Sequence, residues 1–224
     1  MPPMRAAVGR AAIGGAILLL AAASSNAFGA APQGRVSEAT IVAQLSELRA
    51  VFMRRIDEEG YRLCAAPRLE RDDAPGLTRY LPERDTIVIG AVAAPQADPL
   101  PEYGDYAWSL VHELGHWWQD CRRQARPRAY GAEAGANRIA LAFWRERRPR
   151  FAQAVVQRSQ DMLQAIADPL PAGESAQAYL ATHAEAPVDD GTARWLQAQM
   201  IATLAREQPA PSFHKALSQP LYPW

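Results

Sequence analysis

The sequence predicts a mainly helical α+β domain, with a small sheet that precedes the central helix. Two observations lead to this fold class. Apolar residues recur at helical spacing over most of the chain after residue 37, whereas the β-branched run TIVIGAV (86–92) has the composition of a strand. With 224 residues, of which 49% are hydrophobic and 21% charged, the chain is long enough to bury a core. We expect one domain over residues 32–208, between a removable N-terminus (1–31) and a Pro-rich C-terminal tail (209–224).

The first 31 residues have the three-part layout of a secretory signal peptide. Basic residues precede an apolar run at 11–23, and small residues follow that run. The run is shorter than the roughly 20 residues that a membrane-spanning helix needs. We expect cleavage after Ala27 or Ala31, which predicts a periplasmic or secreted protein with no stable membrane insertion. An uncleaved N-terminal anchor is the alternative, and it also places the rest of the chain outside the cytoplasm.

Composition and export together limit the partners and the redox state. Lys plus Arg number 24 and Asp plus Glu also number 24, so no net charge indicates a nucleic-acid partner. Export would place Cys64 and Cys121 in an oxidising compartment, where a disulfide between them is the default expectation. Two buried free thiols are the alternative.

Periodicity and turn residues predict the elements before the central helix. Ser37 is a predicted N-cap for a helix that ends at Gly60. Proline and charged residues then predict a turn ahead of the β-branched strand, and a second proline-rich stretch predicts a surface loop. In chain order we expect a helix, a short strand, a turn, a strand and a loop, at 37–60, 61–64, 82–85, 86–92 and 94–104.

The second half of the chain is predicted to be helical as far as the tail. Pro127, Pro149 and Pro169 separate successive apolar-periodic segments, because proline disfavours helix just before it. Asp189 or Asp190 is expected to cap the last of these helices. The tail from residue 209 is expected to be loosely ordered. The predicted helices span 105–124, 132–148, 151–168, 174–186 and 189–207.

The central helix contains SLVHELGHWWQD (109–120), and this stretch carries most of the chemistry. Residues four apart on an α-helix lie about 40° from each other around the axis, so His112 and His116 point the same way. Glu113 lies at the edge of that face, where it can reach a metal-bound water without binding the metal. This is the HExxH pattern of two zinc ligands and a general base. A helical envelope domain with a chance HExxH and no metal is an alternative.

A third metal ligand is expected on the following helix. The metzincin pattern is absent, because Gln119 and Arg122 occupy the positions that it would need. The segment GAEAGANRIA instead supplies Glu133, with Asn137 one helical turn later. The residues between them are small, so this helix can pack closely against the first. We therefore expect Glu133 to return toward the two histidines as the third ligand.

These residues resemble those of gluzincin metallopeptidases, and HELGH together with the ExxAN of residues 133–137 is similar to the ImmA/IrrE-like peptidases. The resemblance covers residues from about 85 to about 145. It implies a zinc ion held by His112, His116 and Glu133, with Glu113 as base. It also implies that the strand TIVIGAV could bind an extended peptide by edge pairing. These relatives are mostly cytoplasmic, so their substrates are not carried over to a chain with a predicted signal peptide.

The predicted function is that of an exported zinc-dependent hydrolase, with a peptidase acting on a peptide or protein as the first expectation. Zinc suits two imidazoles and one carboxylate in a tetrahedral site with one open position. Glu113 would take a proton from the attacking water and pass it to the leaving amine. The alternative is a zinc-binding envelope protein that binds peptides with little or no hydrolytic activity.

Several neighbouring side chains are weaker candidates for supporting roles. Asn137 is expected to orient Glu133 or its surroundings, and Asp120 either to bond a ligand histidine or, as we favour, to accept from Arg122 or Arg123. Cys121 is expected to lie nearly opposite the histidines, which argues against a zinc role. The donor that stabilises the oxyanion is left open among four residues, which are His183, Tyr179, Tyr130 and Arg138.

Overall fold

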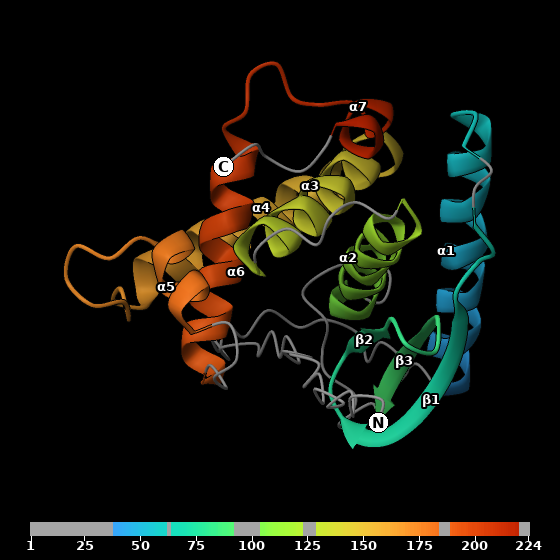
Figure 1. Cartoon of the computed structure of the whole chain (residues 1–224), viewed down its shortest axis with the longest axis horizontal. Coiled ribbons are helices and arrows are strands. Elements are labelled where there is room, and N and C mark those ends of the chain that lie inside the picture. Colours follow the sequence, from blue (N-terminus) through green and yellow to red (C-terminus); the bar gives the residue numbers. More distant parts are fainter. Residues whose placement is uncertain (1–37, 62–63, 92–103, 123–128, 184–188, 220–224) are drawn as a thin grey trace, which may run out of the picture.

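The computed structural model of the chain describes residues 38–61, 64–91, 104–122, 129–183 and 189–219. The predicted signal peptide lies outside these ranges, as does almost all of the predicted loop at 94–104. The described residues form mainly helices, with a three-stranded sheet ahead of the central helix, which confirms the predicted fold class (Figure 1). The elements are α1 (Glu38–Glu58), β1 (Arg68–Pro75), β2 (Thr78–Leu81), β3 (Thr86–Ala91), α2 (Gly104–Cys121), α3 (Ala129–Arg147), α4 (Pro149–Ala165), α5 (Ala176–Thr182), α6 (Asp190–Ala205) and α7 (Phe213–Ser218).

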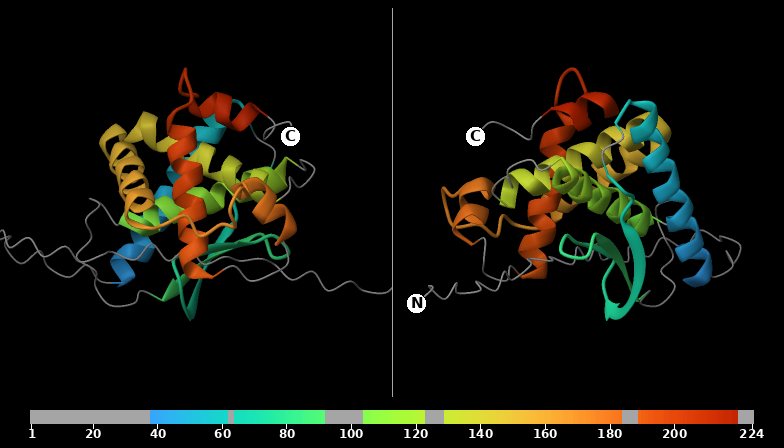
Figure 2. Two further views of the ribbon diagram at one scale, coloured as in Figure 1. Left: turned by 90° about the vertical axis from the view of Figure 1, so that its left-hand side faces the viewer. Right: turned by 45° about the vertical axis from the view of Figure 1, so that its right-hand side comes forward.

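Helix α2 lies at the centre of the fold. It contacts α1 and the strands β2 and β3, and it also packs along α3. Figures 1 and 2 show α6 beyond α3, on the side away from α1, and α6 packs on both α3 and α4. The residues of α2 are therefore covered on several faces, which explains why nearly all of them between Ala107 and Gln119 are buried.

The boundary residues of several helices are those that the sequence predicts. Gly60 ends α1 with a φ of 84°, and the amides of Gly60 and Tyr61 donate to the carbonyls of Asp57 and Ile56. This is the Schellman arrangement, which requires the left-handed conformation that glycine adopts without strain. Asp189 caps α6 by accepting hydrogen bonds from the next amides, as expected.

The sheet has the strand order β1–β3–β2, with β1 parallel and β2 antiparallel to β3. The strand predicted at 86–92 is β3, and the predicted turn at 82–85 joins it to β2. Because β3 lies in the middle of the sheet, the expectation that this strand could bind a peptide by edge pairing is wrong. Within the described residues, β2 is the edge strand that contacts α2.

The prediction of a strand at 61–64 is wrong for its first and last residues, which are the two that the structure describes. Tyr61 and Cys64 lie outside any strand, and β1 begins only at Arg68. Charged side chains dominate β1, whose sequence is RLERDDAP, so it lacks the apolar alternation by which strands are recognised. In contrast, the first four residues of β3 are all buried and give a continuous apolar signal.

Glycine at position 90 allows the chain to pass from β1 to β2 across the end of β3. A Cβ atom there would lie 2.5 Å from the carbonyl oxygen of Gly76 and 3.0 Å from that of Ala74. The amide of Gly90 also donates to the carbonyl of Leu77 at 2.9 Å. The close crossing of two backbones excludes a side chain at this position.

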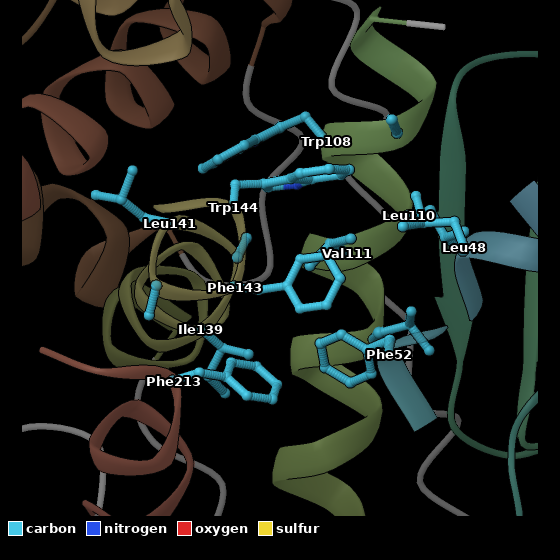
Figure 3. Close-up of a cluster of buried hydrophobic side chains, with 14 of the residues drawn as sticks. Leu48, Phe52, Trp108, Leu110, Val111, Ile139, Leu141, Phe143, Trp144 and Phe213 are labelled. Atoms are coloured by element: carbon cyan, nitrogen blue, oxygen red, sulfur yellow. The ribbon is translucent and has the colours of Figure 1, made fainter. Parts of the chain in front are cut away.

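The core gathers aromatic rings from three helices around α2. Phe52 of α1, Phe143 of α3 and Phe213 of α7 have ring centroids 5.4–5.6 Å apart. Figure 3 shows these three rings facing one another beside Val111 of α2. Contacts of this kind add to the apolar area that the rings remove from water.

The expectation of a loosely ordered tail from residue 209 is wrong for residues 213–218, which form α7. Ser212 caps this helix by accepting from the amide of Lys215. Phe213 and Leu217 are buried, and the carbonyl of Leu217 accepts from the indole of Trp118 at 3.1 Å. The apolar residues between the prolines therefore dock on the core, although the high proline content of the segment obscures them in the sequence.

A disulfide joins Cys64 and Cys121, with a Cα–Cα distance of 5.9 Å and 57 residues of sequence separation. It ties the last residue of α2 to the connection between α1 and β1. A cross-link over a loop of this length stabilises the folded state chiefly by restricting the unfolded chain. Among the described residues, no helix combines the length and apolar character that crossing a bilayer requires.

Replacing Phe213 by alanine should lower the free energy of unfolding by about 3–5 kcal/mol, because the ring is fully buried between two others. Lys215→Ala on the exposed side of the same helix is the matched control, with an expected change within about 0.5 kcal/mol. Urea unfolding followed by circular dichroism measures both. Equal effects of the two changes would mean that α7 is not part of the core.

Candidate metal site

His112 and His116 lie on one face of α2, as their spacing predicts. Their Nε2 atoms are 3.1 Å apart, and the two rings meet nearly edge to face. His112 is buried, with 1% of its side chain exposed, whereas His116 is 18% exposed. Two imidazole nitrogens at this distance cannot both present lone pairs without a cation or a proton between them.

Glu133 of α3 completes the group. Its Oε2 lies 3.2 Å from Nε2 of His112, and its Oε1 lies 3.4 Å from Nε2 of His116. In the part of the chain that the structure describes, these three residues form a group whose donor atoms all lie within 4.8 Å of one another and could hold a metal ion. The structure thus brings together the three ligands that the sequence predicts.

Glu133 reaches the histidines because α2 and α3 approach very closely. A Cβ atom at position 115 would lie 2.9 Å from the Cα of Ala136 and 3.1 Å from its carbonyl oxygen. Glycine inside HELGH is therefore required by the backbone of α3. The small residues after Glu133 allow this approach, as the sequence predicts.

The spacing of the donor atoms allows the group to hold a metal ion. A tetrahedron with zinc–ligand bonds of about 2.0–2.1 Å has edges of about 3.3–3.4 Å. The Nε2–Nε2 distance is 3.1 Å, and the two nitrogens lie 3.2 and 3.4 Å from Oε2 and Oε1 of Glu133 respectively, so each of these distances is close to that edge length. Two imidazoles and one carboxylate also form a donor set that zinc accepts while one coordination position stays open.

In the metal-free state, the carboxylate of Glu133 stabilises a positive charge on His116. Burial lowers the pKa of His116, but the charge and hydrogen bond of Glu133 outweigh it and raise the pKa to about 9. Burial conversely raises the pKa of Glu133, and the two imidazoles outweigh this and hold it well below its usual range. A proton on His116 thus supplies the cation that the three donor atoms require.

Glu113 lies beside this group but is not part of it. Its Oε2 accepts a hydrogen bond of 2.8 Å from the backbone amide of Tyr80 on β2, and only 7% of the residue is exposed. Burial raises the pKa of the Glu113 carboxyl, while the nearby imidazoles of His112 and His116 oppose the rise. Glu113 is therefore a buried carboxylate near the metal site with one oxygen fixed by the sheet.

Amide side chains hold the far nitrogens of both histidines. Asn137 Oδ1 lies 3.0 Å from Nδ1 of His112, so Asn137 contacts a histidine rather than Glu133 directly. Gln119 Oε1 lies 3.3 Å from Nδ1 of His116, and its amide group donates to the carbonyl of Ala132 at 2.9 Å. The side chain that contacts Nδ1 of His116 is thus Gln119. In both pairs the Nδ1–H donates, which leaves Nε2 free for the metal side.

Sequence analysis missed Gln197 of α6, which contacts both Asn137 and Glu133. It stands 60 residues after Asn137 and 64 after Glu133 along the chain, within a helix that has no recognisable motif. The only sign of its role in the sequence is that it is a polar residue between the apolar residues Leu196 and Ala198 of α6.

Each of the four candidates for stabilising an oxyanion contacts other residues of the fold. Arg138 pairs with Glu207 at 3.1 Å. His183 ends α5 and stacks on Tyr179 with ring centroids 4.2 Å apart. Tyr130 and Tyr179 pack against a small apolar cluster that includes Ala134, adjacent to Glu133, and burial raises the pKa of Tyr130.

Comparisons of the chain with protein-family models, with curated proteins and with solved structures found no match. What this site can do chemically therefore follows from its own donor atoms, their spacing and their neighbours. The cluster of His112, His116 and Glu133 could hold a metal ion. Which ion it would hold can be argued only from the preferences of the donor atoms.

The stability of the metal-free protein should fall between pH 6.5 and about 9, because the folded-state pKa of His116 is raised from 6.5 to about 9. The stabilisation is fully present below the unfolded-state pKa and is lost once His116 is neutral. Urea unfolding in the presence of EDTA at several pH values measures this dependence. The fall should be much smaller in His116→Gln and retained in His214→Ala, and an unchanged fall in His116→Gln would contradict the assignment.

Proposed function

We propose that this protein is a zinc-dependent hydrolase, with a peptidase as the specific activity, and that Glu113 is its general base. One observation carries the proposal. The Nε2 atoms of His112 and His116 and the carboxylate of Glu133 face one another at 3.1–3.4 Å, close to the edge of a zinc tetrahedron, and the buried carboxylate of Glu113 lies beside them. HELGH and the Glu133–Asn137 pair further support a relationship to the gluzincin peptidases.

His112, His116 and Glu133 would hold the metal ion in this mechanism. A zinc ion, when bound, supplies Lewis acidity toward a water molecule and a substrate carbonyl. Zinc is preferred over harder cations because two of the three donors are imidazoles. Asn137 and Gln119 contact Nδ1 of the two histidines, which leaves the Nε2 atoms facing each other and Glu133, where they would hold the ion.

Glu113 takes the proton from the attacking water and later delivers it to the leaving amine. Burial raises its pKa toward the pH at which a base works most effectively. The hydrogen bond from Tyr80 fixes one carboxylate oxygen and so limits the rotation of the side chain. This bond distinguishes the proposed base from the ligand Glu133, which lies on a different helix.

We infer the substrate class from the strand beside the proposed base. β2 is the edge strand of the described sheet on the side of α2, and its Tyr80 amide points to Glu113 rather than to β3. An extended peptide that pairs with β2 would run past Glu113, with main-chain hydrogen bonds supplying affinity for any sequence. We therefore propose a peptide or protein substrate that binds along β2.

An extracytoplasmic location belongs to the same proposal. The layout of residues 1–31 supports export, and the Cys64–Cys121 disulfide is consistent with an oxidising compartment. A metal-binding protein that binds peptides without cleaving them would keep the same three ligands, so activity must be tested separately from metal binding.

The purified protein should contain about one zinc ion per chain, and His112→Ala and Glu133→Ala should each lower this content sharply, because each removes a donor atom from the group. Elemental analysis after dialysis against buffered zinc measures the content. His214→Ala is the matched control, since this histidine lies on α7 and bonds Glu59 outside the site. A well-folded parent that binds no zinc would refute the metal site.

Glu113→Gln should retain the zinc content of the parent and reduce peptide cleavage by about 10²–10⁴-fold, because the amide cannot accept the proton of the attacking water. A library of defined peptides, analysed by mass spectrometry after incubation, supplies the measurement. Cleavage by the parent must also disappear with 1,10-phenanthroline. Peptides cut equally by the parent and by Glu113→Gln would contradict the role of this carboxylate.

A further inference from the structure

We propose that Gln197 is a positioning residue of the metal site, which holds Glu133 directly and His112 through Asn137. The inference rests on the metal site of the proposed function but not on any hydrolytic activity. Gln197 belongs to α6, a helix that supplies none of the three donor atoms. Its role would therefore make the geometry of the site depend on a third helix.

The contacts form a continuous chain of hydrogen bonds. Gln197 Nε2 donates to Oε2 of Glu133 at 2.8 Å, and Gln197 Oε1 accepts from Nδ2 of Asn137 at 2.6 Å. Asn137 Oδ1 in turn lies 3.0 Å from Nδ1 of His112. Because Nε2 of His112 faces the same Oε2 of Glu133 at 3.2 Å, these four side chains close a ring.

The ionised carboxylate of Glu133 sets the direction of the three hydrogen bonds that run from it through Gln197 and Asn137 to His112. A carboxylate can only accept, so Gln197 must turn its NH₂ group toward Glu133 and its oxygen toward Asn137. Asn137 must then present its NH₂ group to Gln197 and its oxygen to His112. His112 is left with a proton on Nδ1 and a lone pair on Nε2, which is the form that binds a metal ion.

Burial makes this arrangement obligatory. Asn137 is fully buried and Gln197 is 8% exposed, so solvent offers little replacement for a lost partner. An amide left without a partner in such surroundings destabilises the folded state. The apolar neighbours Leu196, Met200 and Ile201 on α6 provide no alternative strong acceptor, although the Met200 sulfur lies 3.8 Å from Asn137 Nδ2.

His116 is held differently, which makes the proposal specific. Its partner Gln119 comes from the same helix and bonds the backbone of α3 at Ala132. Loss of Gln197 should therefore release Glu133 and His112 while leaving His116 oriented. Without Gln197, Asn137 is free to turn its NH₂ group toward His112, and that orientation favours a proton on Nε2 in place of the lone pair.

The test compares Gln197→Met with Gln199→Met. Both changes replace glutamine by an apolar residue of similar length on α6, but Gln199 takes no part in the ring, and its buried Oε1 has no hydrogen-bond partner among the described residues. Zinc affinity is measured by competition with a chromophoric chelator. We expect Gln197→Met to weaken zinc binding on the order of 10- to 100-fold, and Gln199→Met to leave it unchanged.

A purely structural role predicts a different result. It would lower the thermal stability of the metal-free protein without changing the zinc affinity of the folded molecules. Long-range ¹H–¹⁵N spectra of the metal-free protein supply a second readout, with a proton on Nδ1 of His112 in the parent and a shift toward Nε2 in Gln197→Met. If that variant does not fold, Gln197→Asn, whose amide is too short to reach both partners, serves in its place.

The outcomes separate this inference from the proposed function. Unchanged zinc affinity in a folded Gln197→Met variant, or equal losses in the two methionine variants, would overturn the role of Gln197. A parent that binds zinc tightly but cleaves no peptide would overturn only the hydrolase proposal. A parent that binds no zinc would overturn both.

Discussion

The close approach of α2 and α3 is the constraint on which the rest of the site depends. Gly115 leaves the space that the backbone of Ala136 occupies, and a single methyl group at position 115 would separate the two helices. Glu133 stands three residues before Ala136, so its distance to the two histidines is set by this contact. The packing of one glycine against one alanine thus brings together the residues that could hold a metal ion.

Buried polar groups around the metal site are satisfied by partners from different helices. Asn137 bonds His112, Gln197 bonds both Asn137 and Glu133, and Gln119 connects α2 to α3. Such networks are stable only when every member has its partner, since the low dielectric strengthens each bond and also raises the cost of a missing one. The central helix is further fixed by the disulfide at its end and by the aromatic rings around its middle.

The sequence was sufficient for those features that depend on local spacing. The positions of His112, Glu113 and His116 on one helix follow from helical periodicity, and Glu133 follows from the short connection to the next helix. The strand β1 could not be predicted, because its many charged residues give no apolar pattern and it is stabilised by pairing with β3. The strand β2 has only four residues, TRYL, and likewise depends on its pairing with β3. The role of Gln197 could not be predicted for a related reason. Its contacts with α3 arise from the packing of whole helices, which no local pattern records.

The three residues that could hold a metal ion differ in exposure to solvent. His112 is almost completely covered, whereas His116 and Glu133 remain 18% and 31% exposed. Among the described residues of this group, solvent therefore reaches His116 and Glu133 more readily than His112. If the group holds an ion that a peptide carbonyl approaches, as proposed above, the carbonyl and a chelator would meet the ion on this more exposed side. A bound substrate would then slow the release of the ion.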